Sequence, residues 1–166
     1  MDESGGLRTP GELASGPDGL LYVCSPDTDE ILRFDALTGV FIDAFVTDHP
    51  DTPKHDESGG LQMPAGIAFG PDGQLYVSSQ NTDEILRFDA HTGAFIDTFV
   101  PRASGGLGTP GQLVIGPDGW LYVASLSTHE ILRYDPDTGA FIDVFVDLNP
   151  DSLGSTRQMS LIFMRQ

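Results

Sequence analysis

Short hydrophobic runs alternate with polar turns along most of the chain. The first group of runs occupies residues 12–15, 20–25, 30–35 and 40–46, and the last three runs are rich in β-branched and aromatic side chains. Runs of this length that are bounded by turn residues predict β-strands. No segment keeps the helical period of about 3.6 residues between capping residues, so we expect no helices.

The turns between these runs have two recurring sequences. In the first, Gly-Pro-Asp-Gly, proline and aspartate suit the central positions of a type I turn. It occurs at residues 16–19, 70–73 and 116–119. In the second, Asp-x-x-Thr-Gly, the glycine can take the positive φ that ends a hairpin loop. It occurs at residues 35–39, 89–93 and 135–139. These turns predict antiparallel strands that are joined by short hairpins.

The chain consists largely of three copies of one 43-residue unit, at residues 4–46, 58–100 and 104–146. The first two copies are identical at 30 of 43 positions, which indicates duplication and therefore a common fold. An insert at 47–57 separates these two copies, and a tail at 147–166 follows the third. The tail is not a fourth copy. Its hydrophobic segment 159–164 is expected to be either a strand that latches onto a partner or a frayed remnant of a decayed copy.

Each copy is predicted to be a four-stranded antiparallel meander, and consecutive meanders of this length are typical of β-propeller blades. Hydrophobic residues on both faces of the strands suit a sheet that is covered on both sides. A sandwich would need Greek-key crossings that identical meanders do not supply, and a β-solenoid uses shorter coils. We therefore predict an all-β fold: a single half-propeller domain of three four-stranded antiparallel blades, at 4–46, 58–100 and 104–146.

The second copy resembles an NHL repeat. The resemblance rests on Pro-Ala-Gly-Ile-Ala-Phe-Gly-Pro-Asp-Gly-Gln-Leu-Tyr-Val at 64–77, Glu-Ile-Leu-Arg-Phe-Asp at 84–89 and Thr-Gly at 92–93. It extends over all three copies and is similar to the tandem bacterial form of the family. Fold relatives of that family include streptogramin lyases and gluconolactonase-like propellers. The resemblance implies a propeller that closes with six blades, whereas three copies are present here.

Three blades in an arc leave the outer faces of the first and third blades without a neighbour. From ordinary strand length and spacing, each face measures about 300 Å², and apolar patches of that size usually mark an interface. We therefore expect a homodimer in which two arcs close a six-bladed ring around a two-fold axis. A nine-bladed trimer, or a chain that is part of a longer propeller, stays open as an alternative.

Charge and composition limit the classes of partner that the chain is expected to bind. The chain has 25 acidic and 8 basic residues, for a formal net charge of −17, and this field repels the phosphate backbone of nucleic acids. No hydrophobic run approaches the roughly 18 residues of a membrane helix, and the N-terminal sequence lacks a signal-peptide pattern. We expect a soluble protein without nucleic-acid or membrane partners, in a compartment that the sequence does not specify. The single cysteine, Cys24, excludes an internal disulfide.

Sequence differences among the copies concentrate in one loop and one strand position. The loops between the second and third strands, which we call the variable loops, are residues 25–29, 79–83 and 125–129. In a propeller these loops share one rim with the connections between blades, and the first strand of each blade lines the channel. On this rim we expect a protein or small-molecule ligand, or else merely solvated loops that have drifted. The predicted ligand-binding residues are Glu12, Asp27, Asp29, Asn81, Asp83, Gln112 and His129.

Metal binding is the alternative chemistry for the channel. A dimer would double the polar groups of Glu12 and Gln112, and such an oxygen set suits Ca²⁺. The ligand set of the gluconolactonase-like relatives is not recognisable here, so we predict no cofactor. The insert at 47–57 holds His49 and His55 among carboxylates, and we interpret this insert as an exposed loop and not as a metal site. Resemblance to streptogramin lyases would require a channel histidine, but no histidine lies in a predicted first strand.

The sequence therefore favours a non-catalytic, self-assembling propeller that serves as a scaffold or binds a ligand on its variable-loop rim. No catalytic residue is predicted. The alternative function is a metal-dependent hydrolase or lyase of the gluconolactonase-like and streptogramin-lyase-like class. Arg33 and Asp43, which recur at the same place in every copy, are expected to pair across neighbouring strands in a structural role.

Overall fold

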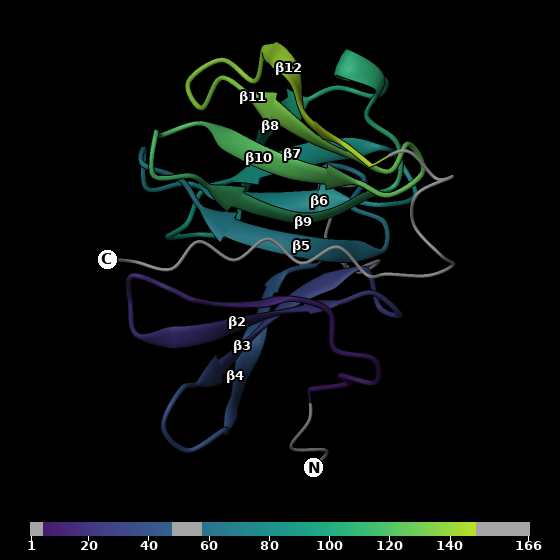
Figure 1. The fold of residues 1–166 in the computed structure, drawn as a ribbon. Coiled ribbons are helices and arrows are strands. Elements are labelled where there is room, and N and C mark those ends of the chain that lie inside the picture. The colour runs from purple at the N-terminus through teal and green to yellow at the C-terminus, as the bar shows by residue number, and fades with distance from the viewer. Residues whose placement is uncertain (1–4, 48–57, 149–166) are drawn as a thin grey trace.

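A computed structural model of the chain describes residues 5–47 and 58–148. The predicted latch segment and the two histidines of the insert lie outside these residues. Figure 1 shows the described strands as three stacked sheets, which we call blades 1, 2 and 3 in chain order. Blade 1 contains β1 (Leu13–Ser15), β2 (Leu20–Ser25), β3 (Glu30–Asp35) and β4 (Phe41–Val46). Blade 2 contains β5 (Pro64–Phe69), β6 (Leu75–Ser79), β7 (Glu84–Phe88) and β8 (Phe95–Val100). Blade 3 contains β9 (Pro110–Ile115), β10 (Leu121–Ser125), β11 (Glu130–Tyr134) and β12 (Phe141–Asp147).

Each blade is an antiparallel meander in which the strands pair in chain order. The second and third strands of blade 1 match the predicted bounds, and the fourth strand starts one residue later than expected, at Phe41. The first strands of blades 2 and 3 start two residues earlier than expected, at Pro64 and Pro110. These prolines pair with Ser79 and Ser125 beyond a register shift. Because the pairing is irregular there, the hydrophobic pattern did not predict the first two residues of these strands.

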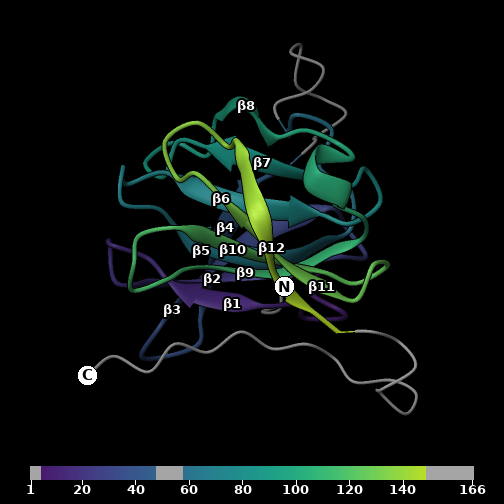
Figure 2. The same cartoon turned by 45° about the horizontal axis from the view of Figure 1, so that its top comes forward.

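Helix is nearly absent from residues 5–47 and 58–148, as the sequence predicted. It consists there of one short 3₁₀ turn, Ser104–Gly106, which leads into blade 3 and is seen as the coil in Figure 2. Within those same ranges there is no helix with the length and apolar character needed to cross a bilayer.

The recurring turns fix the same geometry in every blade. The last glycine of each Gly-Pro-Asp-Gly turn has a positive φ, which is 80° at Gly19, and its N–H donates to the Gly16 carbonyl at 3.1 Å. The predicted cross-strand pair is confirmed: the Arg33 guanidinium donates to both carboxylate oxygens of Asp43, at 2.8 and 2.6 Å. The same two-point pairing recurs in blades 2 and 3, so this arginine holds the outer strands together in all three blades.

Among the described residues, two of the three hydrophobic clusters lie between consecutive blades, and the third, around Leu32 and Phe34, lies within blade 1. At the junction of blades 1 and 2, the Tyr22 ring meets the rings of Phe45 and Phe69 edge to face, with both centroid distances at 5.1 Å. Leu86 and Phe88 of blade 2, both completely buried, complete this cluster. Because each of the two larger clusters is built from two blades, a blade gains most of its stability only when a neighbour covers it.

Candidate functional site

The variable loops share a rim with the connections between blades, as expected. In blade 2 the Asn81 N–H donates to the Gln62 carbonyl at 3.4 Å, and in blade 3 the Ser127 N–H donates to the Gly108 carbonyl at 3.3 Å. The variable loops of blades 2 and 3 are thereby tied to the segments that lead into the first strands of the same blades. In these two blades the loop and the connection between blades form one hydrogen-bonded part of the rim.

Two of the predicted binding residues join one blade to the next. Asp29 Oδ1 accepts the backbone N–H of Met63 at 2.6 Å, and Asp83 Oδ1 accepts that of Thr109 at the same distance. Both aspartates have a positive φ, 57° and 61°, in the left-handed region that Asp tolerates better than most residues. This backbone turn directs the carboxylates of the first two variable loops onto the following blade. We call this hydrogen bond the blade clasp.

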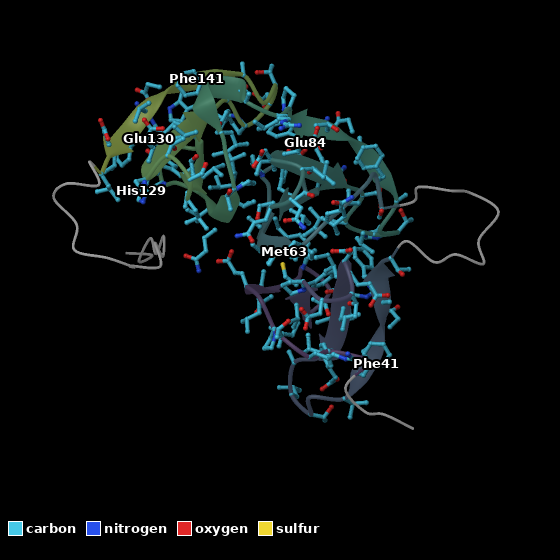
Figure 3. The ribbon with its side chains drawn as sticks, turned by 90° about the vertical axis from the view of Figure 1, so that its right-hand side faces the viewer. Phe41, Met63, Glu84, His129, Glu130 and Phe141 are labelled. Atoms are coloured by element: carbon cyan, nitrogen blue, oxygen red, sulfur yellow. The ribbon has the colours of Figure 1, made fainter. Side chains whose placement is uncertain are left out.

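His129 occupies the third equivalent position. Its φ of 60° matches that of the two aspartates, so the backbone of the third variable loop turns in the same way. The side chain is exposed, whereas Asp29 and Asp83 are half-buried. Figure 3 shows His129 at the blade 3 side of the arc and Met63 between blades 1 and 2. The structure therefore does not bring His129 together with the other predicted binding residues.

Glu12 also links blades, at the inner strands. Its N–H donates to the Ala65 carbonyl at 3.3 Å, and its Oε2 accepts the N–H of Ile67 at 3.2 Å. Burial raises the pKa of the Glu12 carboxyl above its ordinary value, and the hydrogen bond from Ile67 opposes that shift. Cys24 lies next to it, and burial raises the pKa of this thiol far above its usual range, so it is a packed residue and not a nucleophile.

The positions equivalent to Glu12 have different roles. A methyl group at Gly66 would overlap the carbonyl oxygen of Gly111, so blade 2 needs glycine there for close contact between inner strands. Gln112 is half-buried in β9. The variation at this position, which we predicted to reflect ligand binding, is therefore partly a consequence of inner-strand packing.

The described side chains do not fit a Ca²⁺ site in the channel. Of the three equivalent inner positions, only Glu12 supplies a carboxylate, and Ile67 already donates to that group. Within the described ranges no three His, Cys, Asp or Glu side chains gather closely enough to hold a metal ion. A hard cation such as Ca²⁺ needs six to eight oxygen ligands, so this set is too sparse.

A shallow hollow lies where blades 1 and 2 meet, at the ends of the strands away from the variable loops, and the sequence did not predict it. Its volume is about 230 Å³, and Pro17, Asp18, Arg33, Ala90 and His91 line it. Ala90 and His91 belong to the hairpin of the next blade, so the hollow exists only where two blades meet. No pattern along the chain marks such a site, because it depends on contact between blades.

The comparisons with known proteins concern the fold. No family model matches the chain, and no curated protein matches it. Among solved structures, a gluconolactonase from Xanthomonas campestris is 16% identical with a TM-score of 0.65, and the match covers 86% of this chain and 48% of that one. A virginiamycin B lyase from Staphylococcus aureus is 19% identical with a TM-score of 0.60, covering 86% and 42%.

An auxiliary nutrient binding protein from Bacteroides ovatus is 18% identical with a TM-score of 0.63, and the match covers 90% of this chain and 34% of that one. The chain thus spans less than half the length of each of these three proteins. Because these proteins are at most 19% identical to the chain, their similarity is evidence for the fold alone. Together with the three meander sheets, these likenesses confirm that the chain has an all-β propeller fold consistent with the NHL type.

Proposed function

We propose that this chain is a non-catalytic propeller module that binds a polar ligand on its variable-loop rim. The observation that carries the proposal is the contrast between the constant base and the variable tip of each loop. At the base, the Thr28 hydroxyl donates to Ser25 Oγ at 2.8 Å, and Thr128 donates to Ser125 Oγ at the same distance. Binding sites are commonly built in this way, from adaptable side chains on a rigid support.

The tip residues suggest the chemistry of the ligand. Asp27, Asn81 and Ser127 stand at the same tip position of the three loops, and all three are exposed. They offer carboxylate, amide and hydroxyl groups, and the whole chain carries a net charge of −17. This surface favours neutral, hydrogen-bonding or cationic ligands over anions. Both a small molecule and a protein surface of that chemistry fit the proposal.

A thermal-shift screen of neutral and cationic polar compounds tests the proposal. A true ligand at about 100 times its Kd should raise the melting temperature of the wild-type protein by about 5 °C or more. The triple variant Asp27→Ala, Asn81→Ala, Ser127→Ala should lose this shift, and His91→Ala, on a hairpin turn, should keep it. Equal protection of the triple variant would contradict binding at the loop tips.

One observation favours the alternative function of a hydrolase or lyase. The half-buried Glu12 carboxyl has a raised pKa, which is typical of a general acid, and two structural neighbours are a gluconolactonase and a lyase. Assays of sugar-lactone hydrolysis with and without added Ca²⁺ separate the two functions. The proposed module gives no turnover above background. Turnover that Glu12→Gln abolishes would establish the enzyme instead.

A further inference from the structure

Blade 3 exposes side chains that the other two blades bury. Phe145 on β12 is 49% exposed, whereas the equivalent Phe45 and Phe99 are 8% and 5% exposed. Ile131 on β11 is likewise half-buried, and its counterpart Ile31 is completely buried. In blades 1 and 2 the following blade covers the equivalent side chains. We call this surface of blade 3 the outgoing face.

Blade 1 shows the complementary pattern on its opposite side. Leu13 is 57% exposed, whereas the equivalent Ile67 and Leu113 are 3% and 2% exposed. Pro10 is exposed, and its counterpart Pro64 is buried. In blades 2 and 3 these positions pack against the preceding blade. We call this surface of blade 1 the incoming face.

Absence of a neighbour, and not blade composition, explains these differences. The isoleucines at the second position of each fourth strand, Ile42, Ile96 and Ile142, are 46%, 42% and 40% exposed. These values are nearly alike in all three blades, although blade 2 has a neighbour on each side, so neither described junction covers this position. At this position, which no described junction covers, exposure does not rise in blade 3, unlike at Phe145.

The two faces are the two halves of one junction. The outgoing face repeats the side that blade 1 presents to blade 2, and the incoming face repeats the side that blade 2 presents to blade 1. At that junction the turn glycine Gly93 is buried so closely against the Phe45 carbonyl that no side chain would fit. Blade 1 has Gly39 at the same place, exposed, and blade 3 has Phe145 to meet it.

We propose that the outgoing face binds the incoming face of a second copy of this chain, so that two copies close a head-to-tail ring. Figure 3 shows the three blades following one another along an arc, with Phe141 near one end and Phe41 near the other. This chain covers 48% of the gluconolactonase and 42% of the virginiamycin B lyase, so two copies match the length of one such propeller. Two-fold closure leaves no end face bare.

The area of contact is sufficient for a stable dimer. A blade of four strands at their usual spacing and length presents about 300 Å² per face. Closure covers four such faces, or about 1,200 Å² in total, which is at the lower end of specific protein interfaces. Each face also brings a large exposed hydrophobic side chain to the contact, Phe145 on the outgoing face and Leu13 on the incoming face.

The blade clasp distinguishes this new junction from the two described ones. In the ring, His129 takes the place of Asp29 and Asp83 and faces the backbone N–H of Thr9 of the partner subunit. An imidazole accepts one hydrogen bond at most, and a carboxylate accepts a shorter and stronger one. We therefore expect His129→Asp to tighten the dimer, with a fall in its dissociation constant of about tenfold.

Sedimentation velocity and light scattering on purified chain at 1 to 100 µM (a range of about two decades around an ordinary Kd) test the ring. The expected mass is twice the 17.8 kDa of one chain. Phe145→Asp and Leu13→Asp should each give a monomer. Ile142→Asp adds the same charge to a residue that is 40% exposed and lies outside the faces, so it should stay dimeric. Circular dichroism verifies that every variant is folded.

Mixing the two monomeric variants makes the test specific. Phe145→Asp retains an intact incoming face and Leu13→Asp an intact outgoing face, so an equimolar mixture should form a dimer with one working junction. A double variant that carries both changes should not associate with either. A wild-type monomer, as expected if blades of a longer protein cover these faces, would overturn the proposal. So would a trimer, loss of the dimer in Ile142→Asp, or a mixture that stays monomeric.

Discussion

The blade clasp offers a direct test of how one blade is held to the next. Asp83 Oδ1 accepts the Thr109 N–H at 2.6 Å, and the backbone at residue 83 has a φ of 61°. Substitutions at residue 83 can test the hydrogen bond and the left-handed backbone separately. Asp83→Asn retains an acceptor and tolerates the left-handed backbone, Asp83→Gly keeps only the backbone, and Asp83→Ala keeps neither.

The structure sets the size of each effect. A hydrogen bond to a charged group contributes about 1.5 to 3 kcal/mol, and we take the lower part of this range because the Asp83 side chain is 30% exposed. A left-handed backbone costs alanine about 1 kcal/mol more. We expect losses of unfolding free energy of about 1 kcal/mol for Asp83→Asn, about 2 for Asp83→Gly and about 3 for Asp83→Ala. The exposed Arg102, whose nearest nitrogen is 3.9 Å from Asp83, adds little.

Urea unfolding at one fixed protein concentration measures these losses. The fluorescence of Trp120, the single tryptophan, reports on blade 3, and circular dichroism reports on all strands. Asp27→Ala, in the equivalent loop of blade 1 but at an exposed tip, is the control and should change stability by less than about 0.5 kcal/mol. The reasoning is refuted if Asp83→Ala is no more destabilising than Asp27→Ala, or if the three Asp83 variants are equal.

Two further predictions concern the inner strands. Because burial raises the pKa of Glu12 above its usual 4.5, its ionised form costs stability at higher pH and its neutral form does not. Glu12→Gln should therefore raise the melting temperature at pH 7, where the carboxyl is ionised, and the gain should vanish as the pH falls below 4.5. A lower melting temperature of this variant at pH 7 would contradict the reasoning. Gly66→Ala forces a methyl group against the Gly111 carbonyl and should cost about 1 to 3 kcal/mol by calorimetry, whereas Gly11→Ala, whose methyl meets its nearest atom at 3.0 Å, should cost less. Equal costs at these two glycines would show that the inner strands adjust freely.

The candidate site was only partly predictable. The variable loops were found because three copies of one unit could be compared position by position. The roles of Asp29 and Asp83 were missed, because their hydrogen-bond partners lie 34 and 26 residues further along the chain, in another blade. The requirement for glycine at Gly66 was missed for the same reason, since it follows from the approach of Gly111.

The sequence by itself determined the blade. Turn glycines, strand composition and the repeated Arg33–Asp43 pair are local, and they lie at the same places in every copy, so each copy folds into the same meander. The tertiary structure alone decided which side chains are buried. Phe45, Phe99 and Phe145 occupy equivalent places, yet only the first two are covered, because burial depends on the blade that follows and not on the residue itself.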